Sequence, residues 1–238
     1  MFYQSIRIQI AIITKLINNT KFKIDKGDHL LDTHTHILWN IDDGSKNQCM
    51  SLQMLEIAAR SGTKAIFATP HVIERANKPS WEEIKEKTQQ LRQLCAEAQI
   101  DIMLYPGAEV QMNWELLPEL GAAGAYCLNG GRYLLVELPA AEIPAYADEF
   151  WYELELKGIT PILAHPERYQ QLRENPDLLL LWRRRGMLMQ CNSGSFTGMF
   201  GSSVCENAKV LLANGLVDLL GSDGHRSEGR NTDMSRAA

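Results

Sequence analysis

The chain contains 238 residues, of which 45% are hydrophobic and 22% are charged, and its formal net charge is −5. This length and composition allow one sizeable hydrophobic core, so a single domain is the simplest expectation. The negative charge argues against nucleic-acid binding, which needs clustered Lys and Arg. The short run Arg183-Arg184-Arg185 is interpreted as a solvated helix end.

The cysteines indicate a reducing compartment. The five cysteines are widely spaced, and no two of them form the C-x-x-C pair typical of zinc or redox sites. We therefore expect small, reduced, apolar residues of a cytoplasmic protein, at Cys49, Cys95, Cys127, Cys191 and Cys205.

Residues 1–29 are interpreted as an N-terminal extension of unknown role. Residues 6–17 (IRIQIAIITKLI) contain the only candidate targeting segment, but it includes Arg7 and Lys15 and is shorter than the ~20 apolar residues that span a bilayer. No small-residue cleavage site follows it. We expect no stable membrane insertion, and we prefer an extension packed on the domain over the alternative of an interfacial helix.

From residue 30 onward, short apolar runs alternate with segments of helical period, which is typical of repeated βα units and a parallel sheet. The Ser80-x-x-Glu83 capping box opens one of the helices. Seven βα units favour an α/β barrel over an open sheet. The predicted strands are 29–34, 64–71, 101–110, 132–139, 159–167, 187–195 and 217–225, and the predicted helices are 48–62, 80–98, 144–158, 175–186 and 202–215.

Polar residues follow most of these strands. In a parallel barrel the carboxyl ends of the strands share one mouth, where catalytic groups collect. Five of the six histidines in the chain are predicted to lie there. The candidate metal ligands at strand ends are His34, His36, His71, Glu109, Glu137, His165, Asp223 and His225, and Asp43 follows the first strand on its loop.

Each of these residues has a structural interpretation as well. A single histidine after a strand, such as His71 or His165, is more often a hydrogen-bonded structural residue than a ligand. Glu137 differs, because an acid among apolar residues is unfavourable unless it is paired or binds a cation. The combined pattern, rather than any one residue, indicates a metal site.

The number of candidate ligands predicts more than one ion. Four converging carboxylates would repel one another, and divalent cations remove that conflict. Nine ligands are too many for one ion with open positions, so we expect two or three. His34 and His36 stand at i and i+2 of a strand and project on one face, and the spacing of Asp223 and His225 repeats this geometry.

Eight ordered motifs, DTHTH, IDDGS, ATPH, PGAEV, LLVELP, AHPERY, NSGS and SDGH, lie within residues 30 to 231. In this order and spacing they resemble the PHP (polymerase and histidinol phosphatase) superfamily, specifically the bacterial manganese-dependent protein-tyrosine phosphatases of capsular and exopolysaccharide synthesis. The resemblance implies a distorted (β/α)7 TIM-like barrel, with a trinuclear metal centre at the carboxyl ends of the strands.

The resemblance also implies residue roles and a partner. Arg168 and Arg230 would bind the substrate phosphate. The cofactor would be Mn²⁺, with Fe, Zn, Co or Mg as alternatives, and the substrate would be a phosphotyrosine protein, namely a bacterial tyrosine autokinase. The implied ligand sets are His34, His36, Glu109 and Asp223 for the first ion, Glu109, Glu137 and His165 for the second, and Asp43, His71 and His225 for the third.

The chain departs from the family pattern at both ends. The resemblance does not cover residues 1–29. The chain stops 13 residues after His225, where the family continues into a final helical segment, so residues 30–238 are interpreted as a C-terminally truncated phosphatase domain.

Three other functions share some of these sequence features. Thiolate chemistry of the C-x5-R type is rejected, because the nearest match, Cys127 to Arg132, has four intervening residues and precedes a strand. A small-molecule phosphatase of the histidinol-phosphate type shares the metal scaffold. The alternative that is not an enzyme is a non-catalytic metal-binding or kinase-docking module.

Overall fold

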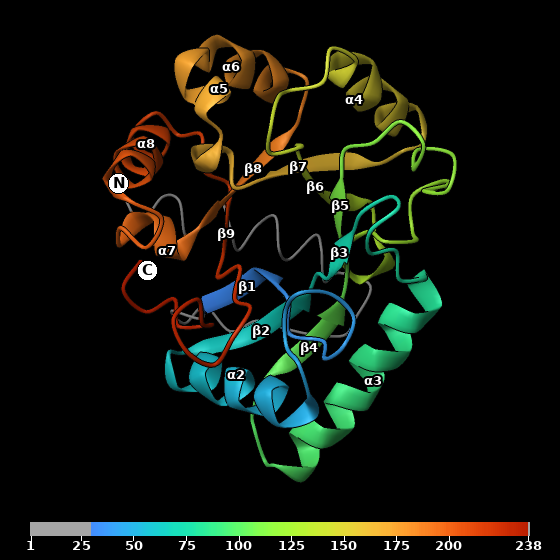
Figure 1. Cartoon of the computed structure of the whole chain (residues 1–238), viewed down its shortest axis with the longest axis vertical. Helices are drawn as coiled ribbons and strands as arrows, with labels where there is room; N and C mark the ends of the chain where they lie inside the picture. The colour runs from blue at the N-terminus through green and yellow to red at the C-terminus, as the bar shows by residue number, and fades with distance from the viewer. Residues whose placement is uncertain (1–29, 238) are drawn as a thin grey trace.

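The computed structural model describes residues 30–237, in which helices surround a curled parallel sheet (Figure 1). The proposed extension, residues 1–29, lies outside the described residues. Within residues 30–237, none of the helices is long and apolar enough to cross a membrane. In chain order the elements are β1 (Leu30–Thr35), α2 (Gln48–Arg60), β2 (Thr63–Ala68), β3 (His71–Val72), α3 (Trp81–Glu97), β4 (Met103–Pro106), β5 (Glu109–Gln111), η1 (Leu128–Gly130), β6 (Tyr133–Glu137), α4 (Ala147–Leu156), β7 (Thr160–Ala164), η2 (Pro166–Arg168), α5 (Gln170–Glu174), α6 (Pro176–Arg184), β8 (Leu188–Asn192), α7 (Ser193–Phe196), α8 (Ser202–Ala213) and β9 (Leu219–Gly221).

The strands form two parallel ladders, β1-β2-β4 and β3-β5-β6-β7-β8-β9. The ladders continue into each other, because the backbone N–H of Gly107 donates to Ala68 at 2.9 Å and that of Glu109 donates to Pro70 at 3.0 Å. A parallel bridge between Thr35 and Gly224 joins the first strand to the chain after the last. This arrangement confirms the predicted barrel-like α/β fold.

Two predicted strands are interrupted. Residues 64–71 split into β2 and β3 around Pro70, which has no N–H to donate to a ladder. Residues 101–110 split into β4 and β5 at Gly107, where a Cβ would lie 2.7 Å from the Leu128 side chain. A short second strand follows each interruption. His71 is the first residue of β3 and Glu109 is the first residue of β5, and these two residues pair in register.

Three predicted strands end three or more residues earlier than expected. β7 ends at Ala164, because His165 takes a left-handed backbone with φ 37° before the turn η2. β8 ends at Asn192 and gives way to the short helix α7. β9 contains only three residues, and Asp223, with φ 53°, lies in the loop that follows. The prediction that Asp223 and His225 repeat the strand geometry of His34 and His36 was therefore wrong.

The helices match the prediction with small changes. The hydroxyl of Ser80 accepts from the Glu83 N–H at 3.1 Å, as the capping box predicts. The predicted helix 175–186 is α6, preceded by the short α5. The arginine run that ends α6 is not simply solvated, because Arg183 forms an ion pair with the buried Asp218.

The core has an inner and an outer layer. The outer layer packs strands against helices, for example with Phe150, Trp151 and Trp182. The inner layer fills the barrel below its mouth and leaves only the carboxyl ends of the strands for polar groups. The inner layer consists of Leu31, Ala65, Phe67, Tyr105, Leu128, Leu135, Ile162, Ala164 and Leu219.

Asp32 reinforces the closure of the barrel. This fully buried carboxylate accepts from the backbone N–H of Ser222 at 2.8 Å and from that of His34 at 3.1 Å, so it ties β1 to the chain after β9. Burial raises its pKa to about 6. Asp32 belongs to the motif that contains His34 and His36, yet its contacts are structural.

Replacing Asp32 tests this closure. Asp32→Ala leaves two buried N–H groups without an acceptor, and each costs about 1–3 kcal/mol of the free energy of unfolding. Asp32→Asn keeps an acceptor oxygen of the same shape and should lose much less. Urea denaturation of the metal-free protein, followed by circular dichroism, measures both. Equal losses in the two variants would show that these hydrogen bonds do not hold the closure.

Candidate metal centre

The nine predicted ligands meet at the carboxyl ends of the strands. Their donor atoms form four overlapping groups, and within each group the atoms lie within 4.8 Å of one another. Every predicted ligand belongs to at least one group. The groups are His34, His36 and Asp223; His34, Glu109 and His165; His71, Glu109 and Glu137; and His36, Asp43, His71 and His225.

Glu109 occupies the centre of this arrangement. Its side chain is fully buried. Its Oε2 atom lies 3.1 Å from Nε2 of His34, 3.2 Å from Nε2 of His36 and 3.1 Å from Nδ1 of His71. Its Oε1 atom lies 2.9 Å from Nε2 of His165. One carboxylate therefore contacts four imidazoles, as a carboxylate shared between neighbouring ions would need to do.

Asp223 completes the first group from the loop after β9. Its Oδ1 atom lies 3.5 Å from Nε2 of His34 and 3.4 Å from Nε2 of His36. These two nitrogens are themselves 3.1 Å apart. The three side chains, with Glu109, present two nitrogens and two oxygens to one point.

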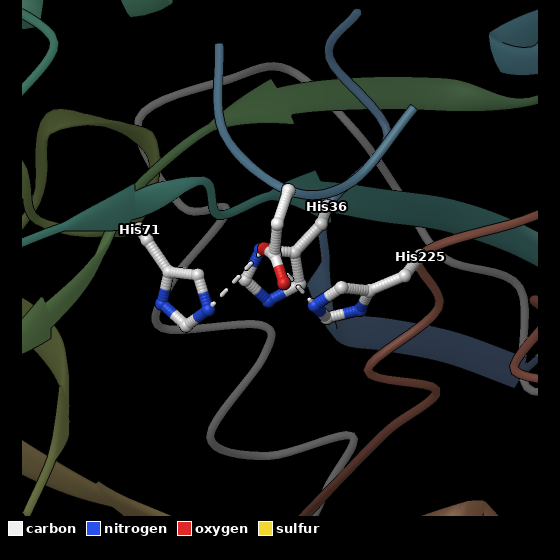
Figure 2. Close-up of side chains that lie close together, drawn as sticks. His36, His71 and His225 are labelled. Atoms are coloured by element: carbon white, nitrogen blue, oxygen red, sulfur yellow. Dashed lines mark ion pairs between the residues drawn. The ribbon is translucent and has the colours of Figure 1, made fainter. Parts of the chain in front are cut away.

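The imidazole of His71 lies between two groups. Its Nδ1 atom is 3.4 Å from Glu137, and its Nε2 atom is 3.7 Å from Asp43. Asp43 also contacts Nε2 of His225 at 3.4 Å. Figure 2 shows the imidazoles of His36, His71 and His225 turned toward one another. The family resemblance implies that His71 belongs to the third ion alone. The geometry also places it beside Glu109 and Glu137, which the resemblance assigns to the second ion.

The donor set fits divalent metal ions. Oε2 of Glu109, Oδ1 of Asp223 and Nδ1 of His71 are buried and make no hydrogen bond to any part of the chain that the structure describes. Such atoms are unfavourable unless they bind a cation. Imidazole and carboxylate together suit Zn, Fe and Mn. The site can therefore hold metal through atoms that make no hydrogen bond within the described residues.

The charges at the site balance one another. Burial alone would raise the pKa of Glu109, but the charge of His34 and the hydrogen bond from His165 hold that pKa well below its usual value. Burial and the nearby charge of Glu109 raise the pKa of Glu137. Because these imidazole nitrogens bind either a proton or a metal, acid should weaken metal binding.

Asp42 orients the imidazole of His36 and holds the backbone of His71, although the sequence indicated a role only for its neighbour Asp43. Its Oδ2 atom accepts from Nδ1 of His36 at 2.7 Å and from the backbone N–H of His71 at 2.9 Å. Burial would lower the pKa of His36, but Asp42 raises it well above its usual value. Carboxylates in this position fix the orientation of metal-binding histidines. The adjacent acids in IDDGS were the signal, but the sequence did not distinguish their roles.

Gln190 contacts Nδ1 of His34 as Asp42 contacts Nδ1 of His36, and nothing in the sequence indicated this contact. This fully buried side chain on β8 lies 3.0 Å, through Oε1, from Nδ1 of His34. Its Nε2 atom donates to the backbone of Cys191 and to Asn192. The oxygen must therefore face His34, which fixes the ring that would bind metal.

Arg226 joins the two loops that supply Asp43 and His225. Its Nη1 atom donates to the carbonyls of Gly44 at 2.6 Å and His225 at 2.8 Å, and it also contacts the carbonyl of Asp43. Gly44 must be glycine, because a Cβ there would lie 2.2 Å from the His36 carbonyl oxygen. These contacts bring Asp43 and His225 to the same side of the mouth.

Arg168 and Arg230 lie at the mouth beside Asp223. Nη1 of Arg168 is 3.1 Å from Oδ2 of Asp223, and Arg230 contacts the same oxygen. Asn192 also donates to it at 2.6 Å. Both guanidinium groups border a cavity of about 450 Å³ that reaches His71, Glu109 and Glu137. An anion that enters this cavity therefore meets two arginines and the candidate metal site.

The structure contains no thiolate site at Cys127. This residue is buried, and burial raises its pKa to about 11. Arg132 points elsewhere and donates to the hydroxyl of Thr160 at 2.8 Å. Both observations agree with the rejection of cysteine-based phosphatase chemistry. All five cysteines are free.

Solved structures share this fold. Work on YwqE from Bacillus subtilis and CpsB from Streptococcus pneumoniae, described as unique metal-dependent tyrosine phosphatases, provides a crystal structure with a TM-score of 0.82. It is 34% identical in sequence and covers 87% of this chain and 84% of that one. Histidinol phosphate phosphatase from Lactococcus lactis has a TM-score of 0.55 at 17% identity, over 87% of this chain and 93% of that one, which shows a common fold alone.

Sequence comparison leads to a single family. Tyrosine-protein phosphatase YwqE of Bacillus subtilis is 34% identical over 87% of this chain and 82% of that protein. Tyrosine-protein phosphatase CpsB of Streptococcus pneumoniae is 28% identical over 87% of this chain and 88% of that protein. Residues 30–238 match the family described as "Capsular polysaccharide synthesis, CpsB/CapC". The chain belongs to this CpsB/CapC family.

Proposed function

We propose that this protein is a metal-dependent phosphomonoesterase that hydrolyses phosphotyrosine in proteins, with Mn²⁺ as its native metal. The observation that carries the proposal is the largely buried cluster of nine histidine and carboxylate side chains, with two arginines beside it in one cavity. Relatives that bear the name tyrosine-protein phosphatase support the same reaction.

The metal would be held by three overlapping sets of side chains. His34, His36, Glu109 and Asp223 would hold one ion, and Glu109, Glu137 and His165 a second. Asp43, His71 and His225 would hold the third, with His71 also close to the second set. When bound, divalent ions lower the pKa of water toward neutrality and offset charge on the phosphoryl oxygens.

The chain itself binds and orients the substrate. The planar guanidinium groups of Arg168 and Arg230 can each donate paired N–H groups to phosphate oxygens. Because most of the cluster is buried, a phosphate must project into the cavity, and the long side chain of tyrosine reaches further than that of serine. A phenolate, with a pKa of about 10, leaves without strong acid assistance.

Family membership and the cysteines bear on the partner and the location. Membership of a capsular polysaccharide synthesis family supports a bacterial tyrosine autokinase of capsule or exopolysaccharide synthesis as the substrate. Five free cysteines support a cytoplasmic location. Residues 30–238 would form the phosphatase domain.

Removal of metal tests the reaction class. EDTA should abolish hydrolysis of p-nitrophenyl phosphate and Mn²⁺ should restore it, whereas iodoacetamide should leave the rate nearly unchanged, because no cysteine lines the cavity. Turnover of a phosphotyrosine peptide should exceed that of histidinol phosphate. An enzyme that resists chelators but loses activity with iodoacetamide is incompatible with the proposal, and a metal-bound protein without turnover would favour a non-catalytic module.

Glu109 and Asp43 provide a matched test of the ligand assignment. Glu109 contacts four imidazoles, so Glu109→Gln should lose more than one metal equivalent and nearly all turnover. The side chain of Asp43 is 68% exposed and contacts two imidazoles, so Asp43→Asn should lose at most one equivalent. Elemental analysis of protein purified without chelator measures the metal. Full metal content and near-normal turnover in Glu109→Gln would rule out the shared carboxylate.

Removal of either arginine should separate phosphate binding from metal binding. Arg168 and Arg230 both contact Oδ2 of Asp223, whereas Oδ1 faces His34 and His36. After either change to Ala, Asn192 still donates to Oδ2, so the metal content should stay at the wild-type level. Activity should fall on the order of 100-fold, as for the loss of one donor to a charged transition state.

The control for these variants is Arg60→Ala, which removes an exposed arginine that pairs with Glu56 on α2. It should leave turnover unchanged. Loss of metal from Arg168→Ala or Arg230→Ala would show that the arginines support the metal site rather than the substrate.

A further inference from the structure

One aromatic side chain contacts both arginines of the cavity. The guanidinium carbon of Arg168 lies 4.8 Å from the ring centre of Phe200, and that of Arg230 lies 5.6 Å from it. Phe200 is half-buried in the segment between α7 and α8. Both distances fall within the range of cation–π attraction.

The segment that carries Phe200 is fixed by its backbone. The N–H of Met199 donates to Gly194 at 3.0 Å, and that of Gly201 donates to Gly198, also at 3.0 Å. Gly198 and Gly201 take φ values of 82° and 95°, which other residues rarely adopt. The Met199 side chain covers Gly194, where a Cβ would meet its sulfur at 2.8 Å. These contacts therefore fix the backbone position from which the Phe200 side chain extends.

An aromatic partner suits an arginine that must bind phosphate. The ring attracts the face of a guanidinium and leaves its N–H groups, which lie in the plane, free for another acceptor. Additional carboxylates would instead occupy those donors. In the described chain, Oδ2 of Asp223 is the one side-chain acceptor that contacts either guanidinium, and the buried Nε of Arg230 makes no hydrogen bond.

We propose that Phe200 is a positioning residue that holds Arg168 and Arg230 in the orientation that binds the phosphate dianion. The inference rests on the proposed phosphatase function, and it concerns the phosphate group rather than the tyrosine ring. Two neighbouring guanidinium groups repel each other, and the ring together with Asp223 offsets that repulsion before the substrate arrives. The ring acts through the arginines and needs no contact with the substrate.

The test replaces the ring and measures phosphate binding directly. Phe200→Leu removes the aromatic face and keeps an apolar side chain, and Phe200→Tyr retains the face. The control, Met199→Leu, changes the adjacent exposed residue of the same segment. The readouts are metal content, the inhibition constant of inorganic phosphate, and kcat and KM for p-nitrophenyl phosphate.

Phe200→Leu should raise the inhibition constant of inorganic phosphate by about 3- to 30-fold, the range expected when such contacts are lost. Metal content should stay at the wild-type level, and Phe200→Tyr and Met199→Leu should behave like the wild type. In an Arg168→Ala background, Phe200→Leu should have a smaller effect, because one of its two contacts is already gone.

The outcomes separate this inference from the function on which it rests. If the wild-type protein with Mn²⁺ does not hydrolyse p-nitrophenyl phosphate, the proposed function fails. If the wild type is active but Phe200→Leu has an unchanged inhibition constant, loses metal, or weakens only the binding of aryl phosphates, then Phe200 does not act through the arginines. An equal change in Met199→Leu would show that Phe200 contributes only to the packing of the segment.

Discussion

The placement of one buried carboxylate, Glu109, governs the rest of the site. A charged group without water around it is strongly unfavourable unless opposite charges surround it. The four imidazoles around Glu109 meet that requirement because the end of β1, the first residues of β3 and β5 and the residue after β7 lie at the same level. The parallel sheet supplies that level, and its register sets His71 directly beside Glu109.

The site is built where the regular backbone ends. Pro70 and Gly107 interrupt two strands, and the interruptions allow His71 and Glu109 to begin short strands of their own. His165 and Asp223 hold left-handed backbone conformations, with φ of 37° and 53°. Residues other than glycine adopt such conformations at a cost on the order of 1–3 kcal/mol, which the surrounding packing must offset. Two of the nine candidate ligands thus project from strained positions that a regular strand would not provide.

The sequence predicts the parts of this structure that depend on short-range patterns. Apolar runs that alternate with helical segments predicted seven parallel strands, two of which the structure divides, and polar residues after those runs predicted the nine side chains that meet at the mouth. The boundaries of the strands were not predictable in this way, because they depend on contacts such as that of Gly107 with Leu128, 21 positions away in the sequence. Asp42, Gln190 and Phe200 were missed because their roles depend on contacts that only the fold creates.

Asp223 links the two halves of the site. Its Oδ1 atom faces the imidazoles of His34 and His36, and its Oδ2 atom receives Arg168, Arg230 and Asn192. Burial would raise the pKa of Asp223, but the charge of His34, the hydrogen bond from His36 and the charge of Arg230 hold it well below the usual value, so the carboxylate stays charged. Phe200 acts on the same arginines without using their N–H groups. One carboxylate therefore contacts side chains on both sides of the site, with one oxygen toward the imidazoles and the other toward the arginines.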